Sequence, residues 1–380
     1  MARILAVATA LPAHRYSQKE ITATIGPLLT SNTTKRAVLE RLHAGSRVSS
    51  RHLAQPLERY LDPRSFTETN EVFVRVATNL ATDCLTAALA EAKIDPVEVD
   101  YIMFTSVTGV SAPSIDALLV ERLGLRSDVK RVPMYGLGCV AGAAGIARVN
   151  DYLVGHPDGV AVLVAVELCS LTFQRGDDSM ANLVASGLFG DGAAAVVMVG
   201  SERARRESKS GLDVVDTRSA LYPDSSEVIG FNLTESGFRI VLTERVTKVV
   251  EQYFRADTIA FLAANDRVIA DIDHWVAHPG GPRVLETFAD CLGLDAGALH
   301  ASWDSLARVG NLSSVSVLHI LAESISATRA RGGLESWQSW RPGPGPGPRP
   351  GMGQGVGQHT LLFALGPGVS AELVLLCWSA

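Results

Sequence analysis

Short, continuously apolar segments of strand-forming residues recur along this chain, with helical patterns between them. The clearest of these segments are residues 101–106, 160–166, 193–199, 274–278, 360–365 and 372–378. Strands that are apolar on both faces belong to sheets covered on both sides by helices. The pattern therefore predicts an α/β fold in which helical layers enclose the sheets.

The helical patterns show how the chain is divided. They lie near residues 70–93, 139–155, 243–264, 282–293 and 314–330. A polar, charged stretch at 200–211 interrupts the apolar segments, and we place a boundary there between two halves, 1–210 and 211–380. Residues 341–358 are rich in proline and glycine, which disfavour both helix and central strand, so we expect a surface loop.

Composition limits the function. The formal net charge is −6 and the one basic cluster, residues 203–209, is interpreted as a solvated loop, so no nucleic acid partner is expected. The five cysteines have no metal-ligand spacing, which is typical of unpaired thiols in a reducing cytoplasm. No apolar run is long enough to span a bilayer, and residues 1–12 fit a first buried strand as well as a short signal peptide.

Cys139 is the candidate nucleophile. It lies within residues 136–145, a run of small residues that can begin a tightly packed helix. A cysteine at a helix N-terminus lies beside unpaired backbone N–H groups and the positive end of the helix dipole, which favour the thiolate. Taken alone, the window fits a small buried cysteine in a packing motif equally well.

Two later windows offer a base and a stabiliser for an oxyanion, which a thiolate nucleophile needs. His278 ends an apolar strand and precedes a Pro-Gly-Gly turn, a place where α/β proteins carry functional side chains. Asn311 precedes a helical pattern. Each alone has a structural interpretation, as a satisfied histidine and a helix N-cap. The Gly366-Pro367-Gly368 loop alone indicates only a turn.

Taken together and in this order, these windows and residues 188–195 resemble the chalcone-synthase-like type III polyketide synthases of the thiolase superfamily. The resemblance covers nearly the whole chain and is weakest at 25–70 and 332–358. It implies a duplicated, five-layer αβαβα thiolase-like fold, a cytoplasmic homodimer, and CoA thioesters as substrates without metal or other cofactor.

The resemblance also implies a reaction. Cys139, paired with a His278 imidazolium, takes an acyl group from an acyl-CoA starter. His278 and Asn311 donate hydrogen bonds to the thioester oxygen of malonyl-CoA and stabilise the enolate left when carbon dioxide departs. The enolate then attacks the acyl-Cys139 thioester. The starter, the number of extensions and the mode of ring closure, to a pyrone or to a resorcinol, stay open.

The family's pocket positions can be located as well. Phe189 matches one of two gatekeeper phenylalanines, and the smaller Ile240 replaces the second. We therefore expect a wide apolar cavity, a medium- to long-chain fatty acyl starter, and an alkylpyrone or alkylresorcinol product. The other positions assigned to substrate binding are Val107, Thr108, Ala112 (toward the partner subunit's pocket), Cys169, Thr172, Ser313, Gly366, Pro367 and Gly368. Arg41 and Arg47 are candidates for CoA phosphate contacts, because guanidinium pairs well with phosphate.

Other interpretations stay open. One is a tetrahydroxynaphthalene-type synthase that is primed by malonyl-CoA alone. A second is a ketoacyl synthase III that acts on acyl carrier protein. A third is a non-catalytic partner that binds through the Pro/Gly-rich loop, against which the intact triad argues. A nucleotide-binding protein would need a GxGxxG spacing or a Walker A lysine, and the chain has neither.

Overall fold

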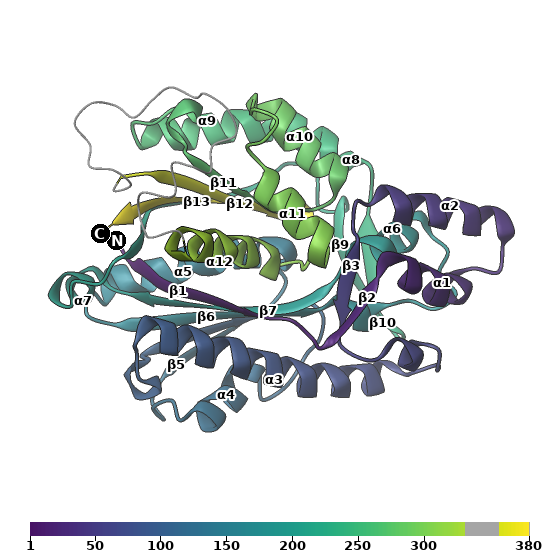
Figure 1. The fold of residues 1–380 in the computed structure, drawn as a ribbon, viewed down its shortest axis with the longest axis horizontal. Helices are drawn as coiled ribbons and strands as arrows, with labels where there is room; N and C mark the ends of the chain where they lie inside the picture. Colours follow the sequence, from purple (N-terminus) through teal and green to yellow (C-terminus); the bar gives the residue numbers. More distant parts are fainter. Residues whose placement is uncertain (331–356, 380) are drawn as a thin grey trace.

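Two helices, α5 (Ala141–Gly155) and α12 (Val315–Ala330), run through the centre of the molecule between two halves of a sheet (Figure 1). The computed structural model describes residues 1–330 and 357–379, so most of the Pro/Gly-rich loop predicted at 341–358 lies outside the described residues. Outer helices cover the far side of each sheet half (Figure 1). The layers follow in the order αβαβα, which confirms the predicted five-layer fold.

Nine strands form the sheet, in the order β11-β12-β13-β8-β1-β7-β6-β4-β5. Their bounds are β1 Arg3–Ala10, β4 Tyr101–Thr105, β5 Lys130–Met134, β6 Val160–Leu168, β7 Asp191–Val199, β8 Gly211–Leu221, β11 His274–Ala277, β12 His359–Gly366 and β13 Ser370–Ser379. Two residue pairs, Arg3 with Asp213 and Ile4 with Leu212, join β1 to β8. The two halves of the sheet therefore meet at a narrow seam, where the Arg3 guanidinium also binds both carboxylate oxygens of Asp213, at 2.6 and 2.9 Å.

The two halves repeat one topology. In the first, β4 and β6 are parallel, and β7 and then β1 follow as antiparallel neighbours. In the second, β11 and β12 are parallel, and β13 and then β8 follow in the same way. Helix α5 precedes β6, and α12 is the last described helix before β12. The two central helices therefore occupy equivalent places, and the duplication implied by the resemblance is visible in the strand pairing.

Side chains alternate along the buried strands and so connect the layers. In β6, Leu163 packs in the central cluster with α5 and α12, whereas Val162 packs in the outer cluster with α3 (Phe66–Ala92). In β12, Leu362 faces the centre and Phe363 the outer helices of the second half. The remaining outer helices are α4 Ile115–Leu123, α8 Arg245–Val249, α9 Arg255–Ala264, α10 Pro282–Leu292 and α11 His300–Val309. A π-helical turn, Val250–Phe254, joins α8 to α9.

Helix α3 is long and apolar enough to cross a bilayer by length and composition, and no other helix in the described part of the chain passes that test. A capping box formed by Ser65 and Glu68 starts it. Its buried side chains, among them Phe73 and Leu85, belong to the outer cluster that packs on β1, β6 and β7. In this fold α3 is a core helix.

The basic cluster at 203–209 differs from the solvated loop that we predicted. Its first residues belong to the short helix α7 (Ser201–Arg206). The Arg203 side chain is 13% exposed and forms ion pairs with Glu98 and Glu207. The pair with Glu98 ties this helix to the chain before β4, whereas the Arg205 and Arg206 side chains are 68% and 58% exposed and so are solvated, as predicted. The apolar start of the chain is strand β1, as predicted.

Smaller elements gather at one end of the molecule, at the right of Figure 1. They are β2 His14–Ser17, β3 Ser50–Leu53, β9 Ile229–Thr234, β10 Gly237–Leu242, α1 Gln18–Leu29, α2 Thr33–Gly45 and α6 Met180–Leu188. β2 and β3 form one antiparallel pair, and β9 and β10 form another. These elements surround the end of the sheet at which the candidate site residues lie.

Candidate active site

Cys139 lies in a turn, Gly138–Val140, that leads directly into α5. Gly142, in the first turn of α5, approaches α12 so closely that a Cβ there would be 2.2 Å from the carbonyl oxygen of Ser314. This contact brings the starts of the two central helices together. As a result, Sγ of Cys139 is 3.4 Å from Oγ of Ser313.

The Gly366-Pro367-Gly368 loop packs on the same turn. A Cβ on Gly138 would lie 2.6 Å from Cδ of Pro367, and a Cβ on Gly366 would lie 2.7 Å from the carbonyl oxygen of Leu137. Larger residues at either glycine would collide with the opposite segment. The loop between β12 and β13 therefore closes over the turn that carries Cys139.

His278 directly follows β11. Its backbone N–H donates to the carbonyl oxygen of Phe363 at 2.9 Å, which continues the pairing of β11 with β12. The residue is 3% exposed, and its Nδ1 is buried without a hydrogen-bond partner among the described residues. Leaving such an atom unpaired is costly. This arrangement is typical of a ring that meets its partner when a substrate or water is bound.

Asn311 lies just before α12, and the two ends of its side-chain amide have different roles. Oδ1 accepts a hydrogen bond from the backbone N–H of Ser313 at 2.8 Å and a longer one from Oγ of Ser316 at 3.4 Å. The oxygen therefore shapes the turn before α12, three residues ahead of the position at which a helix N-cap would stand, so the predicted capping role is not what this side chain performs. The NH2 group is left as the end that can donate to a substrate.

Glu167, near the end of β6, is a buried carboxyl group that the sequence analysis did not single out. It accepts hydrogen bonds from Oγ of Ser314 at 2.6 Å, Oγ1 of Thr108 at 3.0 Å and the backbone N–H of Val107 at 3.2 Å. Oγ of Ser313 lies 3.4 Å from it and so links it to Cys139. A single acidic residue in an otherwise apolar strand is the signal that could have found it.

Burial controls the protonation of these groups. It raises the pKa of Cys139 to about 12 despite the hydrogen bond between this thiol and Ser313, and it lowers the pKa of His278 to about 3. It also raises the pKa of Glu167 to about 7, against the hydrogen bonds that this carboxyl accepts. A helix dipole typically contributes about 0.3–1 kcal/mol, which is less than one pKa unit. Desolvation therefore favours the neutral thiol more strongly than the helix N-terminus favours the thiolate. The paired thiolate and imidazolium stay a prediction.

The predicted pocket residues beside β6 divide into two kinds. Cys169 and Phe189 are partly exposed, at the first position after β6 and after α6 respectively. Thr108 is 4% exposed, and its hydroxyl is held by Glu167 and by the N–H of Leu168. The Thr172 hydroxyl donates to the carbonyl oxygen of Cys169 at 2.9 Å. The hydroxyl groups of the two threonines therefore form hydrogen bonds within the chain, and these bonds support the wall of the predicted pocket.

Ile240 lies on β10, directly opposite Phe231 on β9. Residues that face each other in an antiparallel pair share one face of the hairpin. The ring of Phe231 stands edge-on to Phe238 on that face, with 6.3 Å between ring centroids. The Phe231 ring therefore places, beside Ile240, an aromatic side chain of the size that Ile240 itself lacks. Phe231 was not among the residues predicted to line the pocket.

Three further predicted residues, Ala112, Arg41 and Arg47, are exposed, whereas Val107 and Ser313 are buried. Ala112 lies in the loop after β4, and Arg41 lies on the outer side of α2. Arg47 pairs with Glu286 at 3.3 Å, and its guanidinium carbon lies 4.5 Å from the ring centroid of Trp303. The contacts of both arginines with CoA stay predictions. Within the described part of the chain, no group of three or more His, Cys, Asp or Glu side chains could hold a metal ion.

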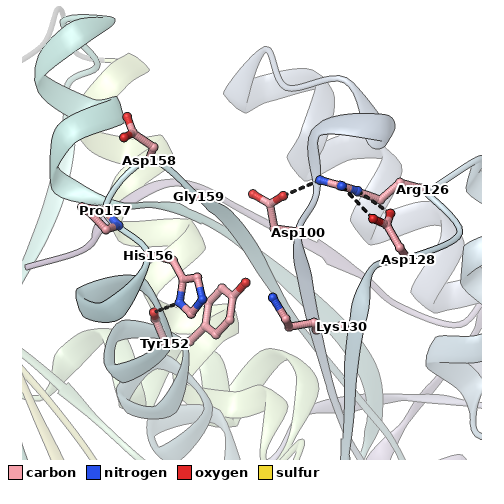
Figure 2. A pocket seen from close by; sticks show the side chains of 9 residues that line it. All are labelled: Asp100, Arg126, Asp128, Lys130, Tyr152, His156, Pro157, Asp158 and Gly159. Carbon is pink, nitrogen blue, oxygen red and sulfur yellow. Dashed lines mark hydrogen bonds and ion pairs between the residues drawn. The ribbon is translucent and has the colours of Figure 1, made fainter.

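A separate surface pocket of about 370 Å³ lies at the opposite end of β4 and β6 (Figure 2). Asp100 lies just before the first residue of β4, whereas the candidate site lies beyond the last residue of that strand. In the pocket Arg126 binds Asp100 at 2.7 Å, and the rings of Tyr152 and His156 stack 4.1 Å apart (Figure 2). None of its lining residues belongs to the group around Cys139.

The comparison with protein families decides the class of this enzyme. The model of the N-terminal domain of chalcone and stilbene synthases matches residues 1–203, and the model of their C-terminal domain matches residues 213–378. The chain belongs to the chalcone and stilbene synthase family. It is a type III polyketide synthase, an acyltransferase of polyketide biosynthesis that acts on CoA thioesters. The predicted enzyme class is confirmed.

Individual relatives refine the comparison. The synthase is 47% identical to the 1,3,6,8-tetrahydroxynaphthalene synthase of Streptomyces peucetius subsp. caesius, over 99% of this chain and 93% of the relative. It is 29% identical to an alpha-pyrone synthesis polyketide synthase-like protein of Mycobacterium tuberculosis, over 90% of this chain and 88% of the relative. The crystal structure of the tetrahydroxynaphthalene synthase of Streptomyces coelicolor A3(2) aligns with a TM-score of 0.87 at 28% identity, covering 100% of this chain and 99% of that chain. We expected the chain to be more similar to alkylpyrone synthases than to tetrahydroxynaphthalene synthases. These identities show the opposite, so that expectation was wrong.

Proposed function

We propose that this synthase uses malonyl-CoA both as starter and as extender and forms a 1,3,6,8-tetrahydroxynaphthalene-type product. The observation that carries the proposal is the 47% identity to the Streptomyces peucetius enzyme of that name across 99% of the chain. The alpha-pyrone relative is less similar, at 29%. The malonyl-primed alternative from the sequence analysis therefore replaces the fatty acyl starter as the leading hypothesis.

In the proposed loading step, Cys139 gives its proton to His278 and its sulfur attacks the thioester carbonyl carbon of the starter. The carbon–sulfur bond to CoA breaks, and the CoA thiol leaves with a proton. Because burial favours the neutral forms of both groups, the proton moves as the acyl group arrives. The unpartnered Nδ1 of His278 supports a ring that is held ready for such a transfer.

In the proposed extension step, the Asn311 NH2 group and His278 donate to the thioester oxygen of the next malonyl-CoA. The bond to the carboxylate breaks, carbon dioxide leaves, and the electron pair becomes an enolate. The enolate carbon attacks the acyl-Cys139 thioester, so that a carbon–carbon bond forms and the thiolate is released. The occupied Oδ1 of Asn311 supports this orientation of the amide.

The carbon balance of the product agrees with malonyl-CoA alone. A naphthalene skeleton has ten ring carbons, which correspond to five malonyl units that each lose their free carboxylate as carbon dioxide, four during extension and one from the starter unit. One aldol closure loses water, and one Claisen closure releases the thiol. The Phe231 ring opposite Ile240 supports the same choice, because it occupies the face at which an alkyl chain was expected to lie.

The test is incubation of the purified protein with ¹³C-malonyl-CoA, alone and with a ladder of unlabelled acyl-CoA starters from acetyl to long-chain fatty acyl. Products are read by mass spectrometry, and Cys139→Ala is the control. We expect malonyl-CoA alone to give a tetrahydroxynaphthalene labelled at every ring carbon, and the control to give none. Alkylpyrones or alkylresorcinols that grow with starter length as the main products would overturn the proposal.

The proposal includes a homodimer formed through β5, the edge strand of the sheet. β5 pairs with β4 on one side, its residues are largely exposed, and Val132 is 37% exposed. An exposed edge with apolar side chains is a surface that proteins usually cover. Ala112, in the nearby exposed loop after β4, would then approach the partner subunit's pocket. Sedimentation velocity is expected to show a dimer and Val132→Asp a monomer, whereas a monomeric unmodified protein would exclude this arrangement.

A further inference from the structure

Arg51, on β3, is a buried cation beside the candidate site that neither the sequence analysis nor the proposed reaction uses. The residue is 3% exposed. Its Nη1 donates to the carbonyl oxygen of Phe189 at 2.7 Å, and its Nε donates to Oε1 of Gln18 at 3.1 Å. Its Nη2 is buried without a hydrogen-bond partner among the described residues. A buried guanidinium is costly unless its contacts serve a purpose.

The carbonyl group that Arg51 binds lies in the middle of a short parallel bridge to Asn311. The backbone N–H of Asn311 donates to the carbonyl oxygen of Leu188 at 2.9 Å, and its carbonyl oxygen accepts from the N–H of Gly190 at 2.9 Å. Phe189 stands between these two bonds, and Arg51 holds its carbonyl oxygen from the other side. The position of Asn311 is thus connected to the Arg51 guanidinium through one peptide segment.

The stem of Arg51 also contacts the residue before Asn311. Gly310 has a φ of +77°, and a Cβ there would be 3.2 Å from Cγ and Cδ of Arg51 and 2.7 Å from the carbonyl oxygen of Leu188. Glycine is therefore required at this position by both its backbone conformation and its neighbours. Arg51 touches the bridge on both of its strands.

Two further contacts hold the same segment. Nε2 of Gln18 donates to the carbonyl oxygen of Gly187 at 2.6 Å, so the side chain that binds Arg51 also binds the start of the segment. Asp191, at its end, accepts from the backbone N–H groups of Ser170 at 2.8 Å and Ala54 at 2.7 Å. The Asp191 carboxylate compensates the charge of Arg51 across the segment, although burial still lowers the pKa of the guanidinium to about 10.

We propose that Arg51 is a positioning residue that sets the Asn311 amide for enolate stabilisation by clamping residues 187–191 against the start of α12. The inference rests on the proposed role of Asn311 as the oxyanion donor. It predicts a selective defect, because acyl loading on Cys139 does not need the Asn311 amide whereas decarboxylation does.

The test is a double-mutant cycle of Arg51→Lys and Asn311→Ala. Lysine keeps the charge but lacks the planar fork whose separate nitrogens bind Phe189 and Gln18. A misplacement of about 1 Å at a reacting centre can cost on the order of 10²-fold, so we expect Arg51→Lys to slow malonyl-CoA decarboxylation by about 10- to 100-fold. Acylation of Cys139, read as the mass shift of the intact protein, should continue. The double variant should decarboxylate no more slowly than Asn311→Ala alone.

Arg15→Lys is the matched control. Arg15 lies on β2, the neighbouring strand, and its Nε and Nη2 contact Oγ of Ser50 at 3.2 and 3.0 Å without touching the 187–191 segment. This variant should keep both activities. If Arg51→Lys fails to fold, as judged by thermal unfolding, Gln18→Met removes one arm of the clamp and should give the same selective loss to a smaller extent.

Equal loss of acylation and decarboxylation in Arg51→Lys, or multiplicative losses in the double variant, would overturn the positioning role alone. Asn311→Ala that still decarboxylates malonyl-CoA would overturn the proposed role of Asn311 and the inference with it. The two failures are therefore distinguishable.

Discussion

At the scale of single residues, the two ends of the Asn311 amide allow its structural role in the turn before α12 to be separated from its proposed catalytic role. Asn311→Asp keeps an oxygen for the Ser313 N–H but removes the NH2 group, whereas Asn311→Ala removes both. Loss of one oxyanion donor typically costs about 10²–10³-fold in rate. We expect both variants to lose decarboxylation and extension by that factor while Cys139 is still acylated, and Asn311→Asp to be the more stable. Full extension activity in either variant, measured by carbon dioxide release, would exclude the donor role.

Glu167 makes the stability of the protein depend on pH. Its pKa rises from 4.5 to about 7 because burial disfavours the carboxylate. Between these values the folded protein holds a proton that the unfolded chain has released, so the free energy of unfolding falls as pH rises through this window. Glu167→Gln removes the effect, which is of order 3 kcal/mol at most. Urea unfolding at pH 5 and pH 8 should show a steeper decline for the unmodified protein, and parallel behaviour would contradict the assignment.

His278 is expected to control the reactivity of Cys139. Burial keeps the thiol protonated, so the thiolate forms readily only if a base takes the proton. In His278→Ala, alkylation of Cys139 by iodoacetamide at pH 7 should slow by about 10-fold or more. Peptide mass spectrometry can follow Cys139 separately from Cys169, which serves as the internal control. An unchanged rate at Cys139 would remove His278 as its base.

The residues that sequence could predict are those that carry their own local signal. Cys139 stands among small residues, His278 before a Pro-Gly-Gly turn, and Asn311 before a helix. Arg51 and Phe231 lack such signals, because their importance comes from contacts with segments distant in the chain, the 187–191 segment and the facing strand of a hairpin. Propensity and periodicity describe residues that are neighbours along the chain. They therefore cannot predict contacts between segments that are distant in the sequence.

At the scale of elements, the close crossing of α5 and α12 holds the candidate site together. A Cβ on Gly142 would lie 2.2 Å from the carbonyl oxygen of Ser314, whereas nothing lies within 4 Å of a Cβ on Gly155 at the other end of α5. Overpacking typically costs about 1–3 kcal/mol. We expect Gly142→Ala to lose this stability in urea unfolding and to lose most activity, because Ser313 would move away from Cys139. Gly155→Ala should change neither, and similar behaviour of the two variants would contradict the proposed role of the crossing.

Elements were predicted best where burial made their pattern strong. The apolar strands and the helices near 70–93, 139–155, 282–293 and 314–330 are all present. The hairpin of β9 and β10 and the edge strand β5 were missed, because exposed or short strands mix polar and apolar residues without clear alternation. Helix α7 was missed because it has only six residues, of which Ala204 alone is buried, so it shows no apolar face in the sequence.

At the scale of the whole molecule, the shared core between the sheet halves couples them more strongly than the narrow seam does. α5 comes from the first half and α12 from the second, and they pack together against both parts of the sheet. All five tryptophans, residues 275, 303, 337, 340 and 378, lie in the second half. The fluorescence of Trp275, Trp303 and Trp378, which lie in described elements of that half, therefore reports its unfolding, whereas far-UV circular dichroism reports both halves. We expect the two signals to give one coincident unfolding transition in urea, and a separate earlier or later fluorescence transition would show independent halves.

The equivalence of α5 and α12 has an evolutionary consequence. Each helix starts at the same end of its own half-sheet, so an ancestral pair of identical halves would have offered two copies of one helix start to a common space. In the present chain the two helix starts differ. The start of α5 bears the sulfur atom of Cys139, whereas the start of α12 bears the amide of Asn311 and the hydroxyl groups of Ser313 and Ser314. The candidate site residues are therefore divided between the two halves, and neither half alone carries all of them.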